Sequence, residues 1–185
     1  MRLGQRYALG LTSLAMTSNH SAKGFRLNHV GLRVADMEKS IEFYSSVFGM
    51  EELYRMPLDT VTVVFLGYAD SADSDLPVFA RQGVLELVCA KKSSEATHEL
   101  NKHPDSRFVK LAFTVPNLET AVKYLTSQNV NFVKKAGTAD GSEVAASFLG
   151  CEAPGKGYDK SLWEAVVPIP FVQDPDGYLI EIIPY

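Results

Sequence analysis

The sequence is poor in cysteine, in long hydrophobic runs and in basic charge, and each shortage excludes a class of protein. Its two cysteines, Cys89 and Cys151, form neither a CxxC pair nor a disulfide framework, which is typical of a reducing compartment. No apolar run reaches the ~20 residues that a membrane-spanning helix needs. Lysine and arginine number 18 against 22 acidic residues, so the net charge of −4 argues against nucleic acid or an anionic membrane as a partner.

Familiar catalytic motifs are missing as well. The chain contains no phosphate-binding G-x-x-x-x-G-K-[ST] loop, no G-x-S-x-G elbow and no H-E-x-x-H helix.

The first 24 residues lack acidic side chains, since the first acidic residue of the chain is Asp36. They carry Arg2, Arg6 and Lys23 among serines and threonines, a composition typical of a mitochondrial transit peptide. The alternative is a disordered start, in which Met16 could serve as a downstream initiator. We therefore expect a leader at 1–24, a single domain at 25–185, and a mitochondrial or cytoplasmic location.

Within 25–185 a strand–helix–strand pattern occurs twice. Asp36 and Asn117 are candidate N-caps of two helices, and Gly49 is a candidate end of the first. The first unit (25–95) has predicted strands at 26–34, 51–54, 60–68 and 84–88. The second unit (105–185) begins with a strand at 107–115, and a Gly-, Ala- and Ser-rich insertion at about 136–168, either a lid or a disordered loop, precedes its last strands.

One offset aligns the two units. It places Asp36 on Asn117 and His29 on Lys110, and downstream Leu-Glu-Leu around Glu86 corresponds to Ile-Glu-Ile around Glu181. This internal duplication predicts two βαβββ units in an α+β fold, with a curved, partly closed mixed sheet.

The duplication also identifies candidate site residues. Glu181 lies between two isoleucines in a predicted strand, where an unpaired carboxylate is costly unless it is paired, protonated or bound to a metal ion. The turn Asp-Pro-Asp-Gly at 174–177 precedes that strand. We expect His29, Glu86, Lys110 and Glu181 to converge on the concave face of the sheet.

The order of several motifs resembles glyoxalase I (lactoylglutathione lyase) of the vicinal-oxygen-chelate superfamily. The motifs are NHVGLRV at 28–34, FY at 43–44, FGM at 48–50, VVFLGY at 63–68, LEL at 85–87, NFVKK at 131–135 and FVQDPDGY at 171–178. The resemblance implies an enzyme that isomerises the hemithioacetal of a 2-oxoaldehyde and glutathione at a zinc or nickel ion. It implies His29, Glu86 and Glu181 as metal ligands, with Glu181 and Glu86 as the catalytic carboxylates.

The resemblance also implies residues that bind the thiol cosubstrate, which is glutathione or a related thiol. Arg33 and either Lys134 or Lys135 match basic residues that hold its carboxylates. However, Ala90 stands where an asparagine is usual, and Ser106 stands where an arginine is expected.

The largest departure is Lys110, which occupies the position of a histidine ligand. Neutralising a lysine at pH 7 costs roughly 4 to 5 kcal/mol, so a charged ammonium paired with Glu181 and Glu86 is the simpler outcome. The alternative is a weaker three-ligand site with Lys110 turned aside. Three functions remain open: a glyoxalase I-like lyase with impaired metal binding, a non-catalytic paralogue that binds a small ligand, and another metal-dependent enzyme such as a dioxygenase or an acyl-CoA epimerase. In the first, short relatives imply a homodimer with sites across the interface.

Overall fold

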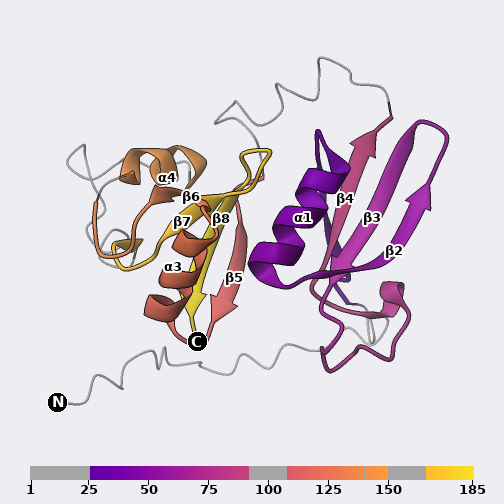
Figure 1. Cartoon of the computed structure of the whole chain (residues 1–185), viewed down its shortest axis with the longest axis horizontal. Coiled ribbons are helices and arrows are strands. Elements are labelled where there is room, and N and C mark those ends of the chain that lie inside the picture. The colour runs from indigo at the N-terminus through magenta and orange to yellow at the C-terminus, as the bar shows by residue number, and fades with distance from the viewer. Residues whose placement is uncertain (1–25, 92–107, 140, 150–165) are drawn as a thin grey trace, which may run out of the picture.

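The computed structural model describes residues 26–91, 108–139, 141–149 and 166–185, which form two α+β units (Figure 1). Both predicted helices and the predicted strands of each unit are present. The first unit comprises β1 (His29–Arg33), α1 (Met37–Phe48), β2 (Glu51–Pro57), β3 (Val61–Gly67), a 3-10 turn η2 (Val78–Ala80) and β4 (Val84–Ala90). The second comprises β5 (Leu111–Val115), α3 (Leu118–Ser127), β6 (Asn131–Lys134), α4 (Ser142–Leu149), β7 (Phe171–Gln173) and β8 (Leu179–Pro184).

The two units repeat one topology, as the internal duplication predicted. The strand orders are β1-β4-β3-β2 and β5-β8-β7-β6. In each sheet the first and last strands of the unit pair in parallel and the remaining strands pair antiparallel. The fold is therefore the predicted pair of βαβββ units.

Local sequence signals set the helix ends. The Asp36 side chain accepts a hydrogen bond from the Lys39 backbone N–H at 3.1 Å, and Gly49 ends α1 with a left-handed φ of 69°. Asn117 caps α3 in the same way, accepting from the Thr120 N–H at 2.9 Å.

The two sheets remain separate instead of joining into one partly closed sheet. Among the described strands no ladder connects them, and α1 lies between the first sheet and β5 (Figure 1). The ring of Phe48 stacks on Phe113 with centroids 4.0 Å apart, so side-chain packing takes the place of backbone pairing between the units. The main core combines residues of both units, including Tyr44, Leu87 and Ile180.

The predicted turn at 174–177 joins the units. Asp174 accepts hydrogen bonds from the N–H groups of Asp176 and Tyr178, both at 2.9 Å, and its other oxygen accepts from the buried Tyr44 hydroxyl of α1 at 2.8 Å. The Asp176 carboxylate accepts from the Ala35 N–H at 3.0 Å. The turn thus fixes where β8, and with it Glu181, lies relative to the first unit.

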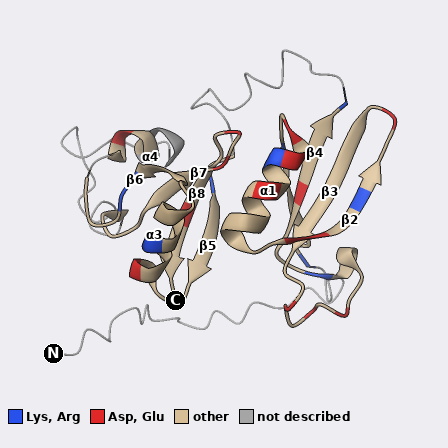
Figure 2. Ribbon diagram, viewed as in Figure 1, with Lys and Arg blue, Asp and Glu red and all other residues tan. Residues whose placement is uncertain are grey.

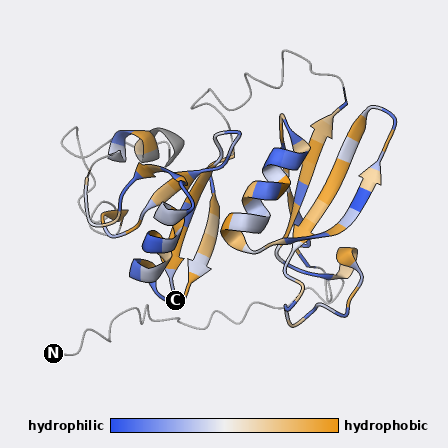
Figure 3. Ribbon diagram, viewed as in Figure 1, coloured by the Kyte–Doolittle hydropathy of each residue, from blue (hydrophilic) through white to orange (hydrophobic). Residues whose placement is uncertain are grey.

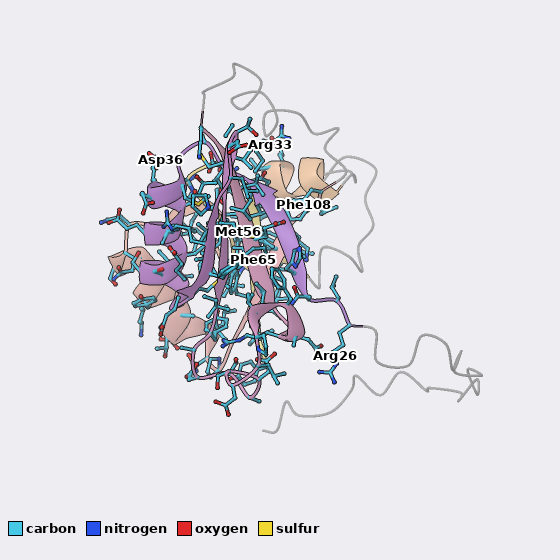
Figure 4. All side chains as sticks on the ribbon, turned by 90° about the vertical axis from the view of Figure 1, so that its right-hand side faces the viewer. Arg26, Arg33, Asp36, Met56, Phe65 and Phe108 are labelled. Carbon is cyan, nitrogen blue, oxygen red and sulfur yellow. The ribbon has the colours of Figure 1, made fainter. Side chains whose placement is uncertain are left out.

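Sheet one, the sheet of the first unit, carries an apolar cluster on each face, and β3 and β4 are drawn mostly in the hydrophobic colour (Figure 3). One face packs on α1 through residues such as Val64 and Leu87. The other carries a separate cluster around Val63, Phe65 and Val84. Met56 of the edge strand β2 and Phe65 of β3 are labelled near the middle of Figure 4, with Arg33 and Arg26 toward opposite ends of the first unit.

The described part of the insertion packs on the sheet of the second unit, which we call sheet two. Ala146 of α4 and Val166 form a buried cluster with Phe171 and Leu179. The predicted leader at 1–24 and the segment 150–165 lie outside the described residues. In the part of the chain that the structure describes, no helix combines the length and hydrophobicity that crossing a membrane requires.

Candidate metal half-sites

His29 and Glu86 lie side by side on neighbouring strands. Gly31 pairs with Glu86 in the parallel ladder, so His29, two residues before Gly31, points to the same face of the sheet as Glu86. His29 Nε2 lies 3.7 Å from Glu86 Oε2, and the side chains are 35% and 24% exposed. A histidine nitrogen and a carboxylate oxygen therefore share one open patch of sheet one.

Gly31 leaves room for this arrangement. A Cβ at this position would lie 2.7 Å from Glu86 Oε2. Because that distance is far below van der Waals contact, any side chain here would displace the carboxylate. The glycine thus allows Glu86 to lie across β1 next to His29.

Lys110 and Glu181 occupy the matching place in the second unit. Ala112 pairs with Glu181 in the ladder, as Gly31 pairs with Glu86 in the first unit. The Lys110 ammonium donates a hydrogen bond to Glu181 Oε2, and the side chains are 26% and 14% exposed. The expected ion pair with Glu181 is present, whereas Glu86 lies beside His29 and not beside Lys110. Glu181 lies on the opposite face from the buried Ile180 and Ile182.

Charged residues are sparse in the strands, most of which are drawn as uncharged (Figure 2). Glu86 is the only charged residue of β4 and Glu181 the only one of β8, and each has a basic partner. A carboxylate that is partly withdrawn from water needs such a partner. In the second unit the partner is a full positive charge, whereas in the first it is an imidazole.

The first pair fits a divalent ion and the second does not in its present form. Two atoms bound to one tetrahedral zinc ion at about 2.1 Å each lie about 3.4 Å apart, close to the separation of His29 Nε2 and Glu86 Oε2. An ammonium offers no lone pair, so Lys110 contributes charge instead of a ligand atom. Within the described residues of one chain, no cluster of three or more His, Cys, Asp and Glu side chains lies close enough to hold a metal ion.

One aromatic ring contacts His29 on the open face, and two further rings pack against that ring. The His29 ring meets the edge of Phe65 at a centroid distance of 5.4 Å, and Phe65 in turn contacts Phe79 and Tyr54. Phe79 and Tyr54 are 57% and 45% exposed. We call Phe65, Phe79 and Tyr54 the aromatic patch, which gives the half-site an apolar border.

The match to known proteins covers most of the chain. The family model described as Glyoxalase/Bleomycin resistance protein/Dioxygenase superfamily matches residues 26–182. The chain belongs to this superfamily.

Its relatives include named enzymes of the glyoxalase branch. A lactoylglutathione lyase of Schizosaccharomyces pombe is 28% identical over 176 residues, which are 91% of this chain and 50% of the relative. A lactoylglutathione lyase of Neisseria meningitidis serogroup B is 31% identical over 163 residues, 85% of this chain and 89% of the relative. The chain thus spans half the length of the first relative and most of the second.

The fold is shared with the trypanothione-dependent glyoxalase I of Leishmania major. The two structures superpose with a TM-score of 0.50 at 24% identity, over 86% of each chain. This likeness shows a shared fold.

The basic residues that the resemblance connects with a thiol cosubstrate differ in their surroundings. Lys134 is only 1% exposed, and its amine donates to the carbonyls of Val167 at 2.9 Å, Ile169 at 2.8 Å and Lys135 at 3.2 Å. Burial also lowers the pKa of Lys134. Lys134 is therefore committed to holding the end of the insertion on β6, a role that sequence reasoning missed because it depends on distant carbonyls.

Arg33 and Lys135, the other two basic residues of the glyoxalase pattern, both have exposed side chains that a ligand can reach. Arg33 ends β1, on the face that carries His29, and its carbonyl accepts a hydrogen bond from the Tyr178 hydroxyl at 2.9 Å. Ala90, which replaces an asparagine of the glyoxalase I pattern, lies at the end of β4. Ser106 lies outside the described residues.

Proposed function

We propose that this protein is a glyoxalase I-like lyase whose metal binding is weakened by Lys110. The reaction converts a 2-oxoaldehyde–thiol hemithioacetal to an S-2-hydroxyacylthiol, with glutathione or a related thiol as cosubstrate. One observation carries the proposal. His29 and Glu86 lie side by side where β1 pairs with β4, and Lys110 and Glu181 lie at the equivalent positions where β5 pairs with β8.

In this proposal His29, Glu86 and Glu181 would hold zinc or nickel, which supplies Lewis-acid polarisation of substrate oxygens when it is bound. Glu181 or Glu86 accepts the proton from the hemithioacetal carbon and returns it to the neighbouring carbon. The isomerisation moves the C–H proton to the neighbouring carbon and the hydroxyl proton to the neighbouring oxygen, so it requires no oxidant or reductant.

The thiol cosubstrate would be held by its carboxylates. Arg33 and Lys135 are exposed and positively charged, which suits recognition of carboxylates. Lys134 carries no free donor in the described structure, so we assign this role to Lys135 in preference to Lys134.

We further propose that two copies of the chain complete each site as a homodimer. His29 and Glu86 of one copy would face Lys110 and Glu181 of a second copy. Two observations support this assembly. The described residues of one chain hold too few ligand atoms for a metal ion, and Phe79 and Tyr54 of the aromatic patch are exposed, since exposed apolar area beside polar residues is typical of an interface. Sedimentation at micromolar concentration tests it, and a monomer there would contradict it.

The second candidate is a non-catalytic paralogue that binds a small ligand. The Lys110–Glu181 ion pair favours it, because a side-chain ammonium already neutralises the carboxylate that a metal ion would otherwise neutralise.

An activity assay with methylglyoxal and glutathione separates the two candidates. The lyase proposal expects slow but measurable isomerisation in wild-type protein supplied with zinc or nickel, abolished in both Glu86→Gln and Glu181→Gln. The exchange Glu119→Gln, on the exposed surface of α3, is the matched control and should leave the rate unchanged. Wild-type turnover no higher than that of the two site variants would favour the non-catalytic paralogue.

A further inference from the structure

Asn28 precedes β1, and its amide contacts three groups. Its side-chain nitrogen donates hydrogen bonds to two backbone carbonyls, Val78 O at 2.9 Å and Arg81 O at 2.6 Å. Its side-chain oxygen lies 2.6 Å from His29 Nδ1. Both carbonyls belong to the 3-10 turn η2 or to the residue that follows it.

These three contacts determine which atom of each group carries hydrogen. A carbonyl oxygen only accepts, so the Asn28 atom that faces Val78 and Arg81 must be the NH₂ group. The amide oxygen then faces His29, and since it too only accepts, His29 Nδ1 must donate. In the neutral imidazole this leaves the lone pair on Nε2, the atom that lies 3.7 Å from Glu86 Oε2.

The His29 ring is supported from a second direction. Phe65, which is 2% exposed, meets the ring in an edge contact at 5.4 Å with planes inclined by 78°. Asn28 therefore selects the tautomer while Phe65 limits the tilt of the ring.

We propose that Asn28 is a positioning residue that fixes the tautomer of His29, so that the Nε2 lone pair faces Glu86 and is available as a metal ligand. The part that concerns metal rests on the proposed function, whereas the tautomer is a property of the metal-free protein. Hydrogen bonds to the distal nitrogen of a ligating histidine fix its tautomer and raise its basicity, and their loss typically weakens metal affinity 10–100-fold.

The loop that holds Asn28 is itself anchored, which supplies a control. Arg81 Nε donates to Leu76 O at 2.9 Å, and Asp73 accepts from the Gln82 N–H at 2.7 Å. Asp73→Ala loosens this loop without removing any atom that touches His29. It therefore separates loss of loop stability from loss of the contact with the imidazole.

The tautomer can be read by long-range ¹H–¹⁵N NMR of the metal-free protein at alkaline pH, where imidazole is neutral. His29→Gln identifies the His29 signals. We expect Nδ1–H in the wild type and in Asp73→Ala, and a mixed or Nε2–H tautomer in Asn28→Ala. Asn28→Asp keeps the accepting oxygen but loses both donated bonds, so it should destabilise the fold like Asn28→Ala and still retain Nδ1–H.

Zinc titration provides the second readout. In both the wild type and Lys110→His, adding Asn28→Ala should weaken zinc binding at least tenfold, and adding Asp73→Ala should change it less than about threefold. An Nε2–H tautomer in the wild type, or an unchanged Nδ1–H in Asn28→Ala, would overturn the proposal. Absence of zinc binding in the wild type and in Lys110→His would count against the proposed function alone, because the tautomer decides the role of Asn28.

Discussion

Replacing Lys110 by histidine removes an ammonium from the second half-site and adds a neutral ligand in its place. In the wild type the ammonium donates to Glu181 Oε2, the same carboxylate that the proposal assigns to the metal ion. The ion and the ammonium therefore compete for one group. We expect Lys110→His to raise zinc affinity at least tenfold, about 1.4 kcal/mol.

The magnitude follows from two limits. Two unit charges about 4 Å apart interact by about 4 kcal/mol at an effective dielectric constant of about 20, and a divalent ion doubles this repulsion. Because a lysine side chain can rotate away, the actual penalty is the smaller cost of breaking its hydrogen bond to a charged carboxylate, about 1.5–3 kcal/mol. Relief of that penalty alone corresponds to roughly a ten- to hundredfold gain in affinity.

Isothermal titration with zinc, on protein that has been stripped by chelator, measures the effect. Lys110→Met removes the charge without adding a ligand, so it should recover the relief of repulsion but less affinity than Lys110→His. The matched control is Lys123→His, since Lys123 also pairs with a glutamate, Glu119, but on the exposed surface of α3. Its zinc affinity should equal that of the wild type.

Tight, stoichiometric zinc binding by the wild-type protein would refute the idea that the Lys110 ammonium and the zinc ion compete for Glu181. So would equal affinities of the wild type and Lys110→Met, because the ammonium would then impose no penalty. Turnover should rise less than affinity in Lys110→His, since Ala90 and Ser106 still differ from the glyoxalase I pattern.

Three further substitutions test individual contacts. Gly31→Ala should displace the flexible Glu86 carboxylate and weaken zinc binding severalfold while changing the free energy of unfolding by less than about 1 kcal/mol, which titration and urea unfolding check. Lys134→Met should lower that free energy by about 3 kcal/mol, because buried carbonyls lose their donor. Lys135→Met should leave the free energy of unfolding unchanged and raise the KM for the thiol. The reverse outcome would contradict both assignments. Burial raises the pKa of Asp174 to about 6, so its protonated form favours folding: its contribution is complete below about pH 4 and falls by about 3 kcal/mol as the pH rises through 6. Asp174→Asn should remove that fall in urea unfolding at acid and neutral pH.

Local patterns in the sequence determined much of this protein. N-caps such as Asp36 and Asn117 accept hydrogen bonds from backbone N–H groups within one helical turn. They can therefore be predicted without knowledge of the tertiary structure. The same holds for the turn at 174–177 and for the alternation that sets Glu181 apart from its isoleucine neighbours. The duplication then paired Lys110 with Glu181 by symmetry, because two copies of one unit share one register.

Only the tertiary structure decided what depends on atoms far apart in the chain. Lys134 matched a cosubstrate ligand in sequence, yet the carbonyls of Val167 and Ile169 surround its amine. Asn28 belonged to a motif without a role until η2 placed two carbonyls against its amide and so oriented its oxygen toward His29. Backbone carbonyls are identical at every residue, so no sequence pattern reveals which of them a folded chain will bring to a given side chain.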